Sequence, residues 1–364
     1  MIFKKNDRSI KKSNKKKRVN RGQMMKRNKK YYLLIVHAFF IWPCLYSAQQ
    51  NNNLERDNSL KKANLLIITT AYNHPEYIVW QDKCFKKYLE DKYEFIVLND
   101  ATDETIKQKI DDTCQSLHIR SIRVPQDNRP LGTVHTWASY RHGQAMDYGL
   151  QTIGFDHKGI VVIIDSDMFL INDFSIIDYL KGYDIAGVAR GPDNNNQAYI
   201  WPGLIFFNMN DLADKKNISL ASYDPSGFDT GGALSLYLNA HPNLKKRFFD
   251  HGRLRLYKNN TAVISLLSEP SRGYLLKCAN CVDGIRKNQL SPETECIHKK
   301  ELLKELGFKN NNIMEQKTIP LGAEFILGDT FFHIGGGSGY VHMPEFLKQY
   351  HHQRVGSFMN HILK

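Results

Sequence analysis

The chain has 364 residues, of which 42% are hydrophobic and 11% aromatic, and this composition excludes a mainly disordered protein. The net charge of +13 comes from residues 1–30, which carry 14 Lys and Arg and one acid. The other residues contain 36 basic and 36 acidic side chains, so the remainder of the chain has no net attraction for nucleic acid.

The N-terminal segments predict export or membrane attachment. Residues 1–30 form a basic, solvated tail, and residues 31–48 are an apolar stretch that ends in small residues. The apolar run is short for a bilayer span, which needs ~20 residues, and it fits either a signal peptide or an uncleaved signal anchor. A buried core helix is the third, less favoured interpretation. Either favoured case predicts a lumenal or exported protein, which in the second case is a single-pass type II membrane protein.

Residues 49–62 are polar and aperiodic and predict a linker. From residue 64 onward, apolar runs alternate with helical patterns, which is typical of an α/β fold with a mainly parallel sheet. The predicted strands are Leu65–Ile68, Phe95–Leu98, Ile119–Val124, Ile160–Ile164, Tyr183–Val188 and Tyr199–Asn208. The predicted helices are Glu76–Leu89, Asp103–Leu117, Thr133–Leu150 and Ala233–Leu238. We expect a single domain over residues 63–345 with an irregular C-terminal lobe, followed by a tail at 346–364.

Polar segments follow three of the predicted strands, namely Thr69–Asn73, Asn99–Thr105 and Asp165–Asp167. Since ligands bind at the carboxyl ends of strands in open parallel sheets, we expect these segments to line one edge. Carboxylates gathered there need a compensating cation, which favours a divalent metal. The alternative is that these acids cap helices, and it is strongest for Asp103, which precedes Ile106 at a predicted helix start.

Four segments, in this order and spacing, resemble family 2 glycosyltransferases. Residues 95–105 resemble the strand and acidic turn of those enzymes, and residues 160–170 resemble their Asp-x-Asp strand. Residues 141–147 resemble the helix beneath the sugar-nucleotide, and residues 201–208 the strand on the acceptor side. The resemblance runs from about residue 64 to 340. In one departure, Asn99 replaces the first Asp of the family's turn.

The resemblance implies a GT-A fold with helices on both faces of the sheet, a nucleotide-diphospho-sugar donor, and Mn2+ or Mg2+. It places the donor on five residues, of which Tyr72 and Asp100 hold the base: Thr70, Tyr72, Asp100, His142 and Asp165. Asp165 contacts the ribose or the metal, and Asp167 is the direct metal ligand. The acceptor is a hydroxyl of a glycan, protein or lipid, and no nucleic-acid partner is expected.

Two downstream residues have roles that the resemblance implies and that simpler interpretations compete with. His333 resembles the C-terminal histidine that many GT-A enzymes add as a third metal ligand, with His342 as the substitute. The alternative for His333 is a core histidine beside two Phe. Asp229 is the expected general base if the enzyme inverts configuration, and otherwise a helix cap.

Three other interpretations stay open. Cys278, Cys281, Cys296 and His298 offer four zinc ligands, but their spacing favours a disulfide or free thiols. A non-catalytic sugar-nucleotide- or glycan-binding protein of the same fold is compatible with Asn99. A phosphatase of the haloacid-dehalogenase type, with Asp165 as nucleophile, is disfavoured because the motif lies about a hundred residues into the domain.

Overall fold

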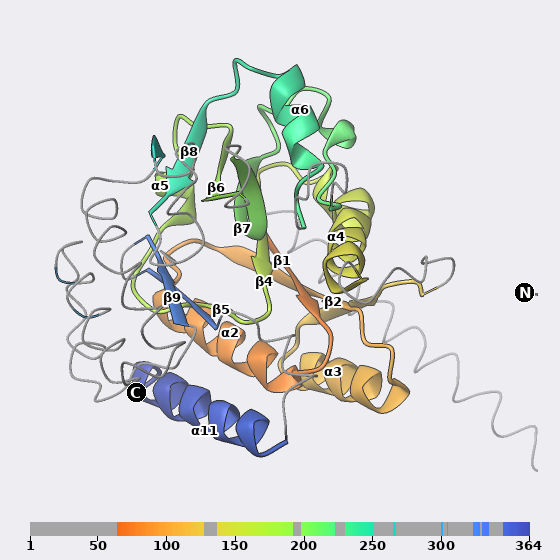
Figure 1. Cartoon of the computed structure of the whole chain (residues 1–364), viewed down its shortest axis with the longest axis vertical. Helices are drawn as coiled ribbons and strands as arrows, with labels where there is room; N and C mark the ends of the chain where they lie inside the picture. The colour runs from red at the N-terminus through yellow and green to blue at the C-terminus, as the bar shows by residue number, and fades with distance from the viewer. Residues whose placement is uncertain are drawn as a thin grey trace, which may run out of the picture. The chain divides into compact units, whose positions relative to one another are not determined.

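The computed structural model describes residues 64–126, 137–191, 198–222, 230–250, 265–266, 300, 304, 323–327, 330–334 and 345–364 (Figure 1). The chain divides into two units, Met1–Ser59 and Leu60–Lys364, and all these residues belong to the second. No helix in these ranges is long and apolar enough to cross a membrane. Several predictions fall outside them, namely those for residues 1–62 and for Asp229, Cys278, Cys281, Cys296, His298 and His342.

The larger of two sheets has the strand order β3-β2-β1-β4-β7-β6-β8. Its strands are β1 (Leu65–Ala71), β2 (Tyr93–Asn99), β3 (Arg120–Arg123), β4 (Ile160–Asp165), β6 (Ile185–Arg190), β7 (Tyr199–Asn208) and β8 (Lys246–Phe249). β7 runs antiparallel to both of its neighbours, and the other pairings are parallel. The prediction of a mainly parallel sheet in an α/β fold is therefore confirmed.

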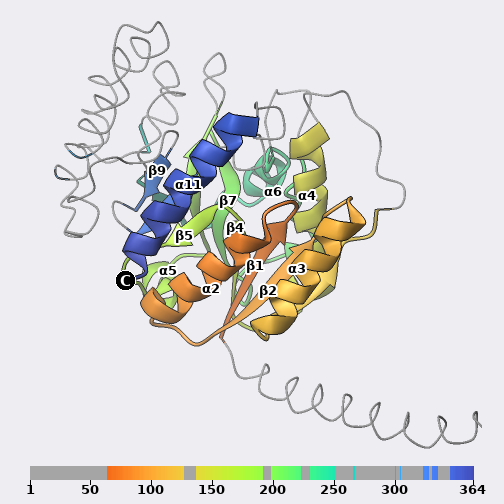
Figure 2. The same cartoon turned by 90° about the horizontal axis from the view of Figure 1, so that it is seen from below.

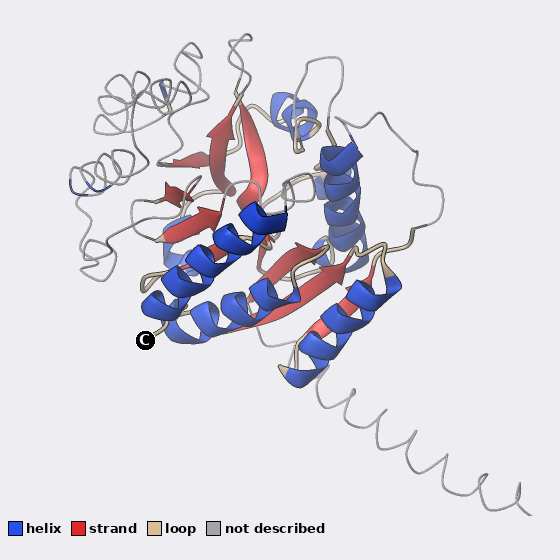
Figure 3. Cartoon of the chain, turned by 60° about the horizontal axis from the view of Figure 1, so that its bottom comes forward, coloured by secondary structure: helices blue, strands red, loops and turns tan. Residues whose placement is uncertain are grey.

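A smaller antiparallel sheet has the order β5-β10-β9, with β5 (Met168–Leu170), β9 (Ala323–Ile326) and β10 (Phe331–Ile334). β5 follows β4 after a two-residue turn, so the small sheet begins where β4 of the large sheet ends. The helices and helical turns are α2 (Pro75–Tyr88), α3 (Glu104–Ser116), α4 (Trp137–Gly149), η1 (Leu150–Gly154), α5 (Ile176–Leu180), η2 (Lys215–Asn217), α6 (Leu234–Ala240) and α11 (Glu345–Ile362) (Figure 3).

Helices cover both faces of the large sheet, as predicted. Because side chains alternate along a strand, β1 sends Leu65 and Ile67 into one apolar cluster and Leu66 and Ile68 into another. The first cluster contains buried side chains of α2, α3 and α11, and the second contains those of α4 and α6. Figure 2 shows the arrangement of these helices around the sheet. Strands that are buried on both faces explain the continuous apolar runs in the sequence.

Local sequence signals set the helix starts. α2 begins with Pro75, whose missing N–H is not needed in the first turn, and Glu76 places a negative charge at the positive end of the helix dipole. The Asp103 carboxylate caps α3 by accepting a hydrogen bond from the Ile106 N–H at 2.9 Å. The predicted capping role of Asp103 is thus confirmed.

The prediction of a tail at residues 346–364 is wrong, because this segment forms most of α11. The helix buries four apolar side chains at helical spacing against the first cluster, namely Val355, Phe358, Met359 and Ile362. Each such burial contributes roughly 1.5–3 kcal/mol. Its end is also fixed, because Lys87 and the Tyr88 hydroxyl donate hydrogen bonds to the Ile362 carbonyl at 3.1 and 2.5 Å.

Asn99, the departure from the family pattern, has a structural role. Its side chain is fully buried, and its amide donates hydrogen bonds to the Lys107 carbonyl and to Asp111 Oδ1, both at 2.8 Å. An Asp at this position has no N–H to donate and faces the Asp111 carboxylate. The amide therefore ties the end of β2 to α3 in a way that an acid does not.

Asn99→Asp is accordingly expected to lower the free energy of unfolding by about 2–3 kcal/mol at pH 7, since two part-buried acceptors each lose a donor and two carboxylates meet. Urea unfolding measures the change as a lower transition midpoint. The matched control is Gln108→Glu, because Gln108 donates to Asp112 Oδ1 at 2.8 Å on the exposed side of α3. An equal shift in both variants contradicts the role given to Asn99.

Candidate metal and donor site

The carboxyl ends of three parallel strands meet at one edge of the large sheet. Ala71 of β1 lies opposite Asn99 of β2, and Thr70 lies opposite Asp165 of β4. The polar segments that follow these strands are therefore neighbours, as the sequence predicts. The metal-binding and donor-binding roles of the residues in these segments stay predictions.

At this edge, three side chains lie close enough together to bind one metal ion. Ligand atoms of Asp165, Asp167 and His333 all lie within 4.8 Å of one another, and His333 Nε2 is 3.3 Å from Asp167 Oδ1. His333 comes from β10, which pairs with β5 so that His333 lies opposite Met168. The Ile334 N–H also donates to the Asp167 carbonyl at 2.9 Å. The small sheet thus brings a distant histidine to the acidic pair.

The Gln81 side chain fixes the turn that carries Asp165 and Asp167. This α2 side chain is fully buried, and its amide nitrogen donates to the Asp165 carbonyl at 2.8 Å and to the Met168 carbonyl at 2.9 Å. The two bonds hold the residues on either side of the turn. Gln81 is therefore a positioning residue for both carboxylates.

The buried Glu324 carboxylate orients His333 by contacting its Nδ1 atom. His333 Nδ1 donates to Glu324 Oε2 at 2.9 Å, and Arg190 Nη2 donates to the same oxygen at 2.7 Å. The Arg190 guanidinium lies over the Trp201 ring at 3.4 Å. An imidazole that donates through Nδ1 presents Nε2 to a metal, and a carboxylate behind it raises its basicity as a ligand.

The protonation of the two histidines follows from these carboxylates. Burial lowers the pKa of His333, but Asp167 and Glu324 outweigh burial and raise it to about 9. Burial likewise lowers the pKa of His142, and the charges of Asp165, Asp167 and Asp100 raise it above its usual value. Without a metal, the His333 imidazole therefore holds a proton that balances the acids at neutral pH, and the same carboxylates favour the protonated form of His142.

The residues present fit a divalent cation. Asp165 Oδ1 is buried and makes no hydrogen bond of good geometry, although His142 Nε2 is 3.1 Å away. Two carboxylates and one imidazole are a donor set suited to Mn2+, and waters or phosphate oxygens complete such a shell. A buried carboxylate oxygen whose neighbouring donor is poorly aligned gains a well-directed partner when it ligates a cation.

The other predicted donor residues lie beside this cluster. His142 Nε2 is 2.9 Å from the Thr70 hydroxyl, which links α4 to β1. Asp100 is buried and paired with Arg141, whose Nη2 is 3.2 Å from Asp100 Oδ1, while the Arg141 guanidinium lies 5.5 Å from the centre of the Tyr72 ring. The base contact predicted for Asp100 thus involves a carboxylate that is already neutralised.

Sequence reasoning missed Gln81, Arg190 and Glu324. The signal for Glu324 was available, because two short apolar runs flank Gly328-Asp329 and such a pattern is typical of a hairpin. Gln81 and Arg190 lie on elements whose other side chains are mostly apolar, and their roles depend on residues far along the chain. No local pattern marks such residues.

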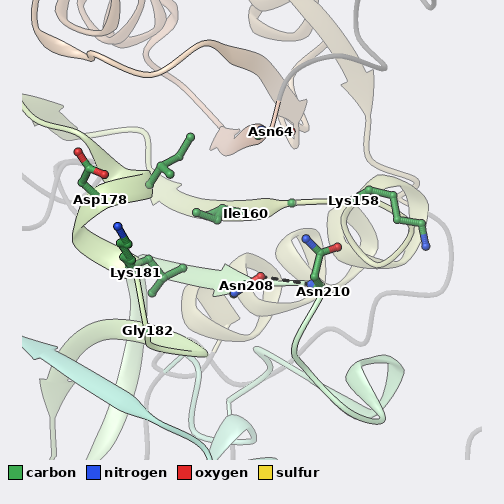
Figure 4. A pocket seen from close by; sticks show the side chains of 11 residues that line it. Asn64, Lys158, Ile160, Asp178, Lys181, Gly182, Asn208 and Asn210 are labelled. Atoms are coloured by element: carbon green, nitrogen blue, oxygen red, sulfur yellow. Dashed lines mark hydrogen bonds between the residues drawn. The ribbon is translucent and has the colours of Figure 1, made fainter.

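A separate hollow of about 500 Å3 lies at the opposite edge of the sheet (Figure 4). Ile160, which begins β4, and Asn208, which ends the antiparallel β7, both line it, together with Asn64, Lys158 and Asp178. No group of three metal-ligating side chains lies there among the described residues. Parallel sheets bind ligands at the carboxyl edge, so this hollow is not the candidate site.

Comparisons with known proteins show a distant likeness. No protein-family model matches the sequence, and no curated protein matches it. Glucosyl-3-phosphoglycerate synthase from Mycobacterium tuberculosis, solved with phosphoglyceric acid, is 14% identical with a TM-score of 0.34, over 51% of this chain and 69% of that chain. An active-site mutant of LgtC is 14% identical with a TM-score of 0.28, over 40% and 57%.

Core-mannan synthase A from Aspergillus fumigatus, solved in an Mn/GDP form, is 8% identical with a TM-score of 0.30, over 43% of this chain and 62% of that chain. Identities and TM-scores this low carry no conclusion about the substrates, metal or activity of this chain. The structure itself has the α/β fold that the sequence predicted, with a mainly parallel sheet and helices on both faces, an architecture consistent with the GT-A type.

Proposed function

We propose that the protein is a metal-dependent glycosyltransferase that moves a sugar from a nucleotide-diphosphate donor to a hydroxyl acceptor. One observation carries the proposal: ligand atoms of Asp165, Asp167 and His333 converge within 4.8 Å of one another at the carboxyl edge of the sheet. When bound, a divalent cation supplies Lewis-acid stabilisation to the diphosphate that leaves the sugar.

The protein's own residues have distinct tasks in this proposal. Asp165, Asp167 and His333 hold the cation, while Gln81 fixes the turn between the two acids. His142, beside Thr70 and Asp165, offers an imidazole N–H to a phosphate oxygen. The Asp229 carboxylate is the proposed acceptor of the proton from the attacking hydroxyl, if the reaction inverts configuration.

A donor screen tests the proposal. The protein is heated with Mn2+ and each of a set of uridine and guanosine diphospho-sugars, and release of the nucleoside diphosphate is measured in parallel. We expect one donor to raise the melting temperature only when Mn2+ is present, because a ligand that binds the folded state stabilises it by mass action. No metal-dependent stabilisation by any donor contradicts the proposal.

The same screen separates the two alternatives. Donor binding without release of a nucleoside diphosphate, with glycan, protein and lipid acceptors supplied, indicates a sugar-nucleotide-binding protein. Hydrolysis of a simple phosphomonoester that Asp165→Asn abolishes, without any response to a diphospho-sugar, indicates a phosphatase.

A further inference from the structure

A second group of metal-ligating side chains lies outside the candidate donor site. Ligand atoms of His74, Glu76 and His352 all lie within 4.8 Å of one another. Glu76 Oε1 is 2.9 Å from His74 Nδ1 and 3.5 Å from His352 Nδ1. Two imidazoles therefore face one carboxylate oxygen, each through its Nδ1 atom.

The three residues come from the start of one helix and from a second helix that is far away in the sequence. His74 is the residue before α2 and Glu76 is in its first turn, whereas His352 lies on α11. Figures 2 and 3 both show α2 and α11 side by side. At the other end of the pair, Lys87 and Tyr88 of α2 bind the Ile362 carbonyl of α11. The cluster is thus a second connection between the same two helices.

Aromatic packing holds the histidines in place. The His74 ring stacks on Tyr77 with centroids 4.8 Å apart, and the His352 ring stacks on Trp80 with centroids 6.1 Å apart. Tyr77 and Trp80 lie on the same helix as Glu76 and stack on each other at 5.5 Å. Rings that are oriented by stacking lose little freedom when they bind an ion, which favours a preorganised site.

The distances suit a small tetrahedral ion. Nitrogen and oxygen ligands at ~2.0 Å from Zn2+ lie about 3.3 Å from one another in a tetrahedron, and the two observed separations of 2.9 and 3.5 Å bracket this value. Two His and one Glu leave the fourth position for water. The His352 side chain is 48% exposed, so an ion can reach the site from solvent.

The two clusters differ in the ion that they favour. The candidate donor site has two carboxylates and one imidazole, which suits Mn2+ or Mg2+. This second cluster has two imidazoles and one carboxylate, and nitrogen-rich sets favour Zn2+, Ni2+ and Cu2+ over Mn2+. The second cluster therefore has a chemistry of its own and does not depend on the proposed transferase activity.

We propose that His74, Glu76 and His352 bind a Zn2+-class ion that fastens α11 to the start of α2. The ion would make three bonds that connect the start of α2 to α11. Because Tyr72 and the end of β1 directly precede His74, the ion also fixes the segment that enters the candidate donor site. Its expected role is to join the two helices, and water as the fourth ligand leaves the site more open than a zinc site closed by four protein ligands.

The test uses the full chain, freed of metal with a chelator and titrated with Zn2+ by calorimetry, without donor or Mn2+. We compare the wild type with His352→Asn and Glu76→Gln. The matched control is His241→Asn, because His241 is also part-exposed and faces a single carboxylate, with its Nε2 3.5 Å from Asp214 Oδ2. We expect His352→Asn and Glu76→Gln each to bind one equivalent of Zn2+ less than the wild type and the control.

Two further measurements keep the result unambiguous. At a hundredfold excess over the dissociation constant, Zn2+ is expected to raise the melting temperature of the wild type and control by about 4–8 °C more than that of His352→Asn. Co2+ substitution is expected to add the visible bands of a tetrahedral nitrogen and oxygen site, without thiolate charge transfer, and His352→Asn is expected to remove them. Identical Zn2+ stoichiometry in the wild type and in a folded His352→Asn or Glu76→Gln variant overturns the proposal.

Discussion

Asp167→Asn is expected to lower Mn2+-dependent cleavage of a nucleotide-diphospho-sugar by about 10³-fold, which corresponds to about 4 kcal/mol of transition-state stabilisation. The substitution keeps the size of the side chain but removes the charge that faces His333 Nε2 at 3.3 Å. The variant should also lose the stabilisation that Mn2+ and donor give together in a thermal shift. Release of the nucleoside diphosphate at saturating donor measures the first effect.

The control for this substitution is Asp178→Asn, which makes the same chemical change on α5. Asp178 is exposed and lines the hollow at the opposite edge of the sheet. We expect its cleavage rate to stay within about twofold of the wild type, in line with the small effects of surface substitutions. If Asp167→Asn keeps metal-dependent turnover at the level of this control, Asp167 is not a metal ligand.

Glu324→Gln is expected to weaken Mn2+ binding by about 10–100-fold, although Glu324 does not belong to the ligand cluster. The change removes the charge that holds His333 through Nδ1 and pairs with Arg190. Metal affinity is measured directly by calorimetry, so the readout does not depend on turnover. Glu104→Gln, on the exposed side of α3, is the matched control and should leave the affinity unchanged.

The pH dependence of metal binding separates positioning from a general loss of structure. The raised pKa of His333, about 9, means that Mn2+ must displace a proton at neutral pH. The apparent affinity is expected to rise about tenfold per pH unit and to level off as the pH passes 9. In Glu324→Gln one of the acids that raise this pKa is gone, so the levelling should begin at a lower pH. An unchanged profile contradicts the role given to Glu324.

The raised pKa of His333 also makes the stability of the metal-free protein depend on pH, with the opposite sign to metal binding. The folded pKa of His333 lies above its usual value, so the protonated imidazole stabilises the folded state fully below about pH 6.5. This stabilisation is lost as the pH rises from there through 9. Metal binding and metal-free stability are therefore expected to change in opposite directions over one pH range.

The parts of the fold that the sequence predicted are those with local causes. The apolar runs of β1 and β4 are buried on both faces, and Asp103 caps α3 through a residue three positions away. The acidic turn after β4 follows from the same logic, because a strand that ends in Asp165 places polar groups at the carboxyl edge of the sheet.

The parts that the sequence did not predict depend on distant partners. α11 has a weak apolar stripe with many His and Gln residues, and its burial requires the surface of α2. Likewise, Glu324 and Arg190 are 134 residues apart, and no sequence pattern near either residue predicts their ion pair. The resemblance brought His333 into the predicted site, but its pairing with β5 and its support by Glu324 come only from the three-dimensional arrangement.

Asp165 and Asp167 directly precede β5, whereas His333 lies on β10, much later in the chain. The two acids therefore leave the ribosome well before the histidine. The strands β1, β2 and β4 can pair as soon as they have emerged, and this early core already carries Asp165 and Asp167. His333 and Glu324 reach it only after the segment beyond β8 has been synthesised. A nascent chain therefore carries the two acids of the candidate site before the histidine that completes the ligand cluster has been synthesised.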